Sequence, residues 1–252
     1  NNKESPHVAW GWNNDRYMVV YHAPLSGGED DSFFTHVYET YQSTGTQYMF
    51  NSTYLYKTEN VDYDNIATSI TYDPVTEKFL TLVNHDYYGD GSDYDVHLYV
   101  HSATDAYVFT PTGVVVADWG EGIDETQGDI SFLTNAWEAQ VNEGPDKVAI
   151  TYHRHDSNKT EIITTVITGN GSKTDPSYSI PDSSWHVQLK EISAPLFYVQ
   201  NPAVAGSDGS GRYMVTWTYH MAGTVHDEDI KGMILLESTT SSIKNFLPLI
   251  IR

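Results

Sequence analysis

Apolar and polar residues alternate along many short stretches of the chain, which is the pattern of half-buried β-strands. The clearest stretches are RYMVVYH at 16–22 and RYMVTWTYH at 212–220. Turn residues such as SDGSG at 207–211 separate the stretches, and such residues favour chain reversals between strands. No long amphipathic helix is predicted, so we expect an all-β fold.

One strand-turn-strand phrase recurs along the chain. It reads PHVAWGWNNDRYMVVYH from Pro6 and NPAVAGSDGSGRYMVTWTYH from Asn201, with weaker copies from Ile66 and Gly128. Each copy continues into a third strand, predicted from Phe33, Asp95, Thr160 and Asp229, and then a fourth, predicted at 47–56, 106–117, 184–192 and 243–251. We therefore divide the chain into four units, 6–60, 61–120, 125–193 and 194–252.

Four antiparallel strands repeated in this way predict a β-propeller of about four blades, formed by residues 1–252 as one domain. Radial repetition leaves only short, protected sheet edges. A β-sandwich is the alternative, and it would explain the number of strands but not the return of one phrase in every unit. The units are longer than ordinary blades of about 40 to 50 residues, so the surplus is expected in loops.

The repeated phrase resembles a family of bacterial extracellular propeller repeats. Their blades read apolar strand, Asx/Gly turn, then an Arg-Tyr-hydrophobic-Val-x-Trp strand. Residues 6–22 and 201–220 match this pattern well, 66–85 match it in part, and the third unit matches it poorly because TNAWEAQVNEGP separates its two strands. The resemblance implies the propeller fold and export, and it implies no activity.

The chain is strongly acidic, with 34 Asp and Glu residues against 13 Lys and Arg and a net charge of −21. This charge would repel a phosphate backbone and an anionic membrane alike. We therefore expect no nucleic-acid partner and no membrane insertion. A solvated acidic surface, bound calcium and contact with cationic partners all remain open.

The chain has no cysteine, which excludes disulfides, thiolate metal sites and cysteine nucleophiles.

An extracellular or cell-surface location is predicted from the resemblance above and from two further features. The chain begins at Asn1 without a signal-like apolar segment, which fits a processed product and equally a trimmed one. Glycosylation sequons occur at Asn51, Asn158 and Asn170, in stretches predicted as strand ends or turns.

A calcium site is predicted in the segment HDYYGDGSDYD, where glycines let the backbone bring oxygen ligands around a hard cation. Its expected ligands are Asp86, Asp90, Ser92, Asp93 and Asp95. The spacing is not that of an EF-hand, and simple solvation of the acidic loop is the alternative. No other cofactor is predicted.

Aromatic side chains in loops are candidates for stacking against a ligand, because they combine a large apolar face with a polar edge. The loop contexts single out Trp119, Trp137, Tyr87 and Tyr88. Trp10 and Trp217 lie in predicted strands and are interpreted as packing residues.

The last segment, KNFLPLIIR, is an apolar run in a polar chain and must be buried. It either completes the fourth unit or pairs with the sheet edge of a neighbouring molecule. In the second case the assembly residues are Phe246, Leu247, Leu249, Ile250 and Ile251.

Our first functional hypothesis is a secreted or cell-surface binding or structural module, with self-assembly into a surface layer or filament as one form of that role. Its expected partners are copies of itself, other surface proteins or glycans. The alternatives are a glycoside hydrolase with paired carboxyl groups and a lectin-like sugar binder. Neither a Gly-x-Ser-x-Gly elbow nor a phosphate-binding Gly-Lys-Ser/Thr loop is present, and no residue is assigned to catalysis.

Overall fold

A computed structural model describes residues 4–13, 15–24, 30–42, 45–54, 65–86, 93–103, 114–133, 147–180, 186–193, 197–206, 212–221, 228–236 and 246–251. These residues form seventeen strands. For β3, β4 and β17 the description covers the path of the backbone. The all-β prediction is confirmed.

The strands form four separate antiparallel sheets of consecutive strands. Sheet A contains β1 (Glu4–Gly11), β2 (Arg16–Pro24), β3 (Asp30–Gln42) and β4 (Gly45–Tyr54). Sheet B contains β5 (Asn65–Asp73), β6 (Lys78–Asp86), β7 (Tyr94–Ser102) and β8 (Val114–Ala117). Sheet C contains β9 (Asp124–Phe132), β10 (Lys147–His155), β11 (Lys159–Gly169), β12 (Tyr178–Ser179) and β13 (Val187–Ser193), and sheet D contains β14 (Phe197–Gly206), β15 (Arg212–Met221), β16 (Glu228–Leu236) and β17 (Phe246–Ile251).

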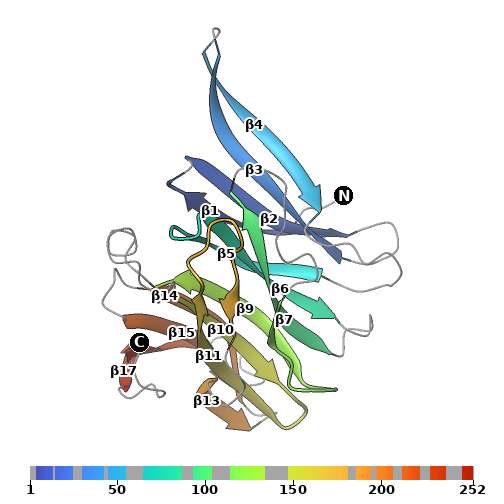
Figure 1. Ribbon diagram of the computed structural model, residues 1–252. Coiled ribbons are helices and arrows are strands. Elements are labelled where there is room, and N and C mark those ends of the chain that lie inside the picture. The colour runs from blue at the N-terminus through green and yellow to red at the C-terminus, as the bar shows by residue number, and fades with distance from the viewer. Residues whose placement is uncertain are drawn as a thin grey trace.

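The sheets pack face to face in chain order, and each interface has its own apolar core. In β6, alternate residues point to opposite faces: Phe79 and Val83 pack with sheet A, whereas Leu80 and Leu82 pack with sheet C. A third cluster, which includes Trp217, lies between sheets C and D. Figure 1 shows the resulting fan, from which the β3–β4 hairpin projects.

The described strands overlap those predicted from the alternation, apart from β12, which was not predicted, and residues 106–113 of one predicted strand, which lie outside the description. Strand β17 pairs with β16 of the same chain. The apolar C-terminal segment therefore completes sheet D. No strand pairing joins one sheet to another in the described ranges, so the arrangement of the sheets as blades of one closed propeller stays a prediction. Within those ranges there is also no helix with the length and apolarity needed to span a membrane.

The packing role predicted for Trp217 is confirmed, since its side chain is 5% exposed. The same role predicted for Trp10 is wrong, because Trp10 is 52% exposed. It lies on the face of sheet A that points away from sheet B, where its ring stacks against Tyr17 at a centroid distance of 6.2 Å.

Candidate functional site

The first strands of the four sheets, β1, β5, β9 and β14, meet around a cavity of about 490 Å³. Its walls come from residues 5 and 7 of β1, 66–68 of β5, 127–129 of β9 and 201–203 of β14. We call this space the central cavity. Ligand pockets commonly have volumes of about 300–1,000 Å³ and lie where several elements converge.

A β-bulge interrupts each of these first strands where it borders the central cavity. Three bulge residues, Ser5, Gln127 and Asn201, have φ angles of 45°, 53° and 51°. This left-handed conformation costs energy for residues other than glycine, although Asn tolerates it better than most. Bulges redirect side chains locally and often lie beside functional sites.

Asp129 is held rigidly in the wall of the central cavity by donors from three sheets. Its Oδ1 accepts hydrogen bonds from Ser69 Oγ at 2.5 Å and from the Ile130 main-chain N–H at 2.9 Å. Its Oδ2 accepts one from the Val204 main-chain N–H at 2.7 Å. The carboxylate therefore ties β5 and β14 to β9.

Gln127 and Asn201 connect two walls of the cavity. Gln127 Oε1 accepts a hydrogen bond from the Asn201 main-chain N–H at 2.8 Å, and Asn201 Nδ2 donates to Thr218 Oγ1 at 3.1 Å. Gln127 Nε2 and Asn201 Oδ1 make no hydrogen bond with the described residues. One donor group and one acceptor are thus available to a ligand.

His7 supplies a titratable ring to the central cavity. Burial lowers the pKa of His7, the Asp129 carboxylate partly raises it, and His22 adds to the lowering. A neutral imidazole has one donor and one acceptor nitrogen. The ring makes no hydrogen bond with the residues that the structure describes, so both nitrogens are open to a ligand.

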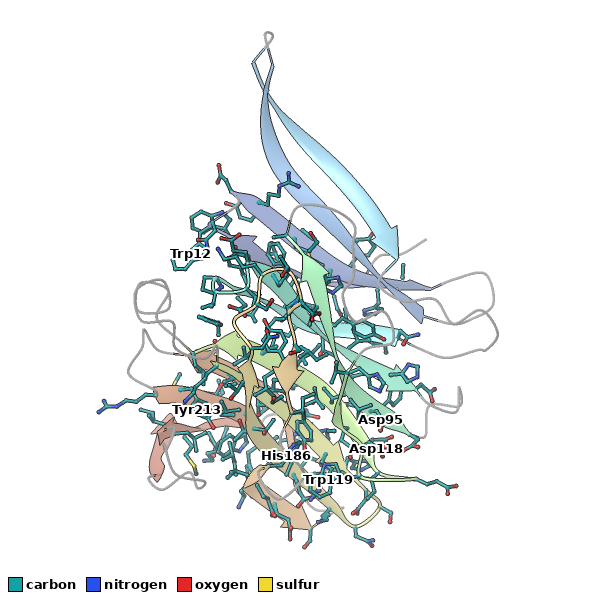
Figure 2. The ribbon with its side chains drawn as sticks, viewed as in Figure 1. Trp12, Asp95, Asp118, Trp119, His186 and Tyr213 are labelled. Atoms are coloured by element: carbon teal, nitrogen blue, oxygen red, sulfur yellow. The ribbon has the colours of Figure 1, made fainter. Side chains whose placement is uncertain are left out.

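A second group of polar and aromatic residues lies where β7 and β9 begin and where β8 and β10 end. We call it the acid–aromatic cluster. Its members are Asp95, Asp118, Trp119, Glu125, Tyr152, Arg154 and His186, of which Figure 2 labels four.

Trp119 Nε1 donates to Tyr152 Oη at 3.1 Å, and that oxygen lies 2.7 Å from His186 Nδ1. The Arg154 guanidinium lies 4.0 Å from the centroid of the Trp119 ring. Trp119, predicted to bind a ligand, therefore has its N–H and one ring face occupied by its own chain.

Two carboxyl groups of the acid–aromatic cluster favour their protonated forms. Burial raises the pKa of Glu125 to about 9, helped by Asp95, while the Trp119 main chain and Arg154 act in the opposite direction. Burial also raises the pKa of Asp95 to about 7, and repulsion from Asp118 and Asp93 adds to this rise. Such groups are easily protonated near neutral pH.

Asp118 lies close enough to Asp93 and Asp95 to raise the pKa of both. Asp86 also acts on the pKa of Asp93. No set of three His, Cys, Asp or Glu residues in the described ranges has the arrangement needed to hold a metal ion. Asp90 and Ser92 lie outside these ranges, so the calcium site stays a prediction.

Several other predicted residues carry no added information about function. Trp137, Tyr87 and Tyr88 lie outside the described residues, and the structure describes only the backbone path at Asn51. Asn158 and Asn170 are exposed. Asn170 Nδ2, the atom that would carry a glycan, donates to the Asp175 carbonyl at 2.9 Å.

Sequence reasoning missed His7, Gln127, Asp129 and Asn201 as candidate site residues. The available signal was their equivalent position at the start of the repeated phrase, just before the apolar part of each first strand. That phrase was used only to count units. The cavity forms from segments far apart in the chain, and local alternation carries no information about their meeting.

No family model matches this chain, and no curated protein does. Among solved structures, the chain is similar to Cellvibrio cellulosa alpha-L-arabinanase complexed with arabinohexaose. The match has 10% identity and a TM-score of 0.44, and it covers 99% of this chain and 77% of the arabinanase chain. No residue role or substrate is transferred from it to this chain.

The hypothesis of a structural, self-assembling module is corrected by this comparison, because the matched protein is an arabinanase bound to a sugar. The predicted assembly residues Phe246, Leu247, Leu249, Ile250 and Ile251 lie in β17, the edge strand of sheet D, which pairs with β16 of the same chain.

Proposed function

We propose that this protein is a carbohydrate-active β-propeller protein that binds a sugar in the central cavity. The observation that carries this proposal is the convergence of four first strands on one space of about 490 Å³, lined by both polar and apolar residues. An extracellular location, with calcium in the acidic loop of sheet B as an optional stabiliser, completes the proposal.

The chemistry of the lining supports a polyhydroxylated ligand. Each sugar hydroxyl both donates and accepts hydrogen bonds, so its site needs groups of both kinds. Gln127 offers an amide donor, Asn201 an amide acceptor, and neutral His7 offers one of each. Apolar atoms of Ile66 and Ala67 complete the lining and can contact the C–H faces of a sugar ring.

Glycoside hydrolysis is the second candidate activity, favoured by the Asp129 carboxylate beside His7 in the cavity. Most glycosidases use two carboxyl groups on opposite sides of the scissile bond. Asp129 is the single carboxyl group among the described lining residues. Binding is therefore the primary proposal, and release of reducing ends from an oligosaccharide panel tests hydrolysis.

Removing the cavity groups that face a ligand is expected to weaken sugar binding. We expect H7A and N201G each to lose roughly fivefold in affinity, because one hydrogen bond contributes about 1 kcal/mol. Glycine keeps the left-handed backbone that Asn201 requires. A neutral-oligosaccharide array followed by calorimetry of the best ligand measures the change.

The matched control is N158G, which alters an exposed asparagine that does not line the central cavity. Its affinity should equal that of the wild type. Failure of every sugar on the array to bind, or full affinity in both cavity variants, would contradict the proposal.

A further inference from the structure

The central cavity contains a negative charge that cannot move away from a ligand. Asp129 receives three hydrogen bonds, from Ser69 Oγ and from the main chains of Ile130 and Val204. A carboxylate has about four lone-pair positions, so one position remains to accept a hydrogen bond from a ligand. Only a ligand group with a proton to donate can use it.

The described part of the lining supplies no compensating cation. Among the described lining residues there is no arginine and no lysine. Burial lowers the pKa of His7, so the imidazole is neutral at neutral pH and does not balance Asp129. The whole chain adds to the negative field with its net charge of −21, which lowers the local concentration of anions.

We infer that the central cavity selects sugars by charge: it accepts neutral sugars, prefers amino sugars and rejects sugars that carry carboxylate, sulfate or phosphate groups. This inference rests on the proposed sugar-binding function and names its substrate class. An ammonium group donates three hydrogen bonds and is attracted to Asp129, whereas a carboxylate is repelled and has no proton to donate.

The test uses hexasaccharides of glucose and galactose, each in its neutral form and with its primary alcohols oxidised to carboxylates, together with a neutral arabinose hexasaccharide and a glucosamine hexasaccharide. Calorimetry with the full chain at low salt measures affinity. We expect the oxidised form of any bound sugar to bind at least tenfold more weakly than the neutral form. We also expect glucosamine to bind at least threefold more tightly than glucose.

Two further measurements assign the selection to charge at Asp129. In D129N the affinity gap between neutral and oxidised sugars should become smaller. D175N removes an equal charge outside the cavity lining and should leave this affinity gap unchanged. If D129N does not fold, a salt titration of the wild type replaces it, because screening should narrow the same gap.

The outcomes separate the two claims. Equal affinity for neutral and oxidised forms, or a gap that neither D129N nor salt reduces, overturns selection by charge and leaves sugar binding intact. Failure of every neutral and amino sugar to bind overturns the proposed function and this inference together.

Discussion

Replacing Glu125 with glutamine is expected to stabilise the protein by about 3 kcal/mol at pH 7, which is a large effect for one neutral substitution. Glu125 is 0% exposed, and neither carboxyl oxygen has a hydrogen-bond partner of normal geometry among the described residues. Glutamine has a similar shape and does not ionise, so it avoids the cost of taking up a proton on folding. Urea unfolding of both proteins from pH 4.5 to 8.5 measures the difference.

The direction of this change in stability follows from the raised pKa of Glu125, which is about 9 in the folded protein against an ordinary value of 4.5. Between these two values the folded protein keeps a proton that the unfolded chain has released. Folding then requires proton uptake, so this group lowers stability progressively as the pH rises through the window. The advantage of E125Q should therefore be small at pH 4.5 and increase with pH. An advantage that does not change with pH would contradict the predicted protonation.

The matched control is E161Q, in the same row of sheet C. Arg154 pairs across the sheet with both Glu125 and Glu161, but its guanidinium bonds Glu161, at 2.6 Å. Lys159 also bonds Glu161, at 3.1 Å. Removing one member of a buried ion pair costs about 3–5 kcal/mol, so E161Q should destabilise the protein at pH 7. The same change from glutamate to glutamine is therefore expected to stabilise the protein at position 125 and to destabilise it at position 161.

The strands were predictable because a strand's alternation is a local property of a few residues. The buried face of each strand was not. Tyr17 and Tyr213 occupy the same place in the repeated phrase, yet they are 48% and 2% exposed. The reason is the order of the sheets: sheet A has its packing partner on one side and sheet D has its partner on the other. Two copies of one phrase therefore bury opposite faces.

The candidate site was less accessible to sequence reasoning than the fold. Acidic and aromatic residues were selected because they cluster in the sequence, as around Asp93 and Trp119. The central cavity instead depends on single polar residues in four separate strands. Asp129 of sheet C raises the pKa of His7 in sheet A, and no local motif contains both residues. The burial that raises the pKa of Glu125 likewise depends on packing between sheets.

Replacing Gly206 with alanine is expected to destabilise the protein by roughly 3 kcal/mol, the upper part of the range for overpacked sites. A Cβ atom there would lie 2.3 Å from the Phe132 carbonyl oxygen and 2.9 Å from Leu133 Cδ2. The oxygen belongs to the main chain at the end of β9, so a rotamer change cannot relieve the contact. The Gly206 main-chain N–H also donates to Ser131 Oγ at 2.8 Å, and moving the two strands apart would break this bond.

Calorimetric melting of G206A should therefore show a decrease of roughly 6–12 °C, since 1 kcal/mol shifts the melting temperature of a domain of this size by about 2–4 °C. Gly232 is the control, because it too is a strand glycine of sheet D and it is buried, whereas Gly206 is half-buried. A Cβ atom at Gly232 would lie 3.1 Å from Thr216 Cγ2, a contact that a small shift relieves, so G232A should lose clearly less stability. Equal losses in the two variants would mean that the cost comes from the flexibility of glycine and not from the close approach of β14 to β9. A larger loss in G206A would show that contact between sheets C and D determines which residue is allowed at position 206.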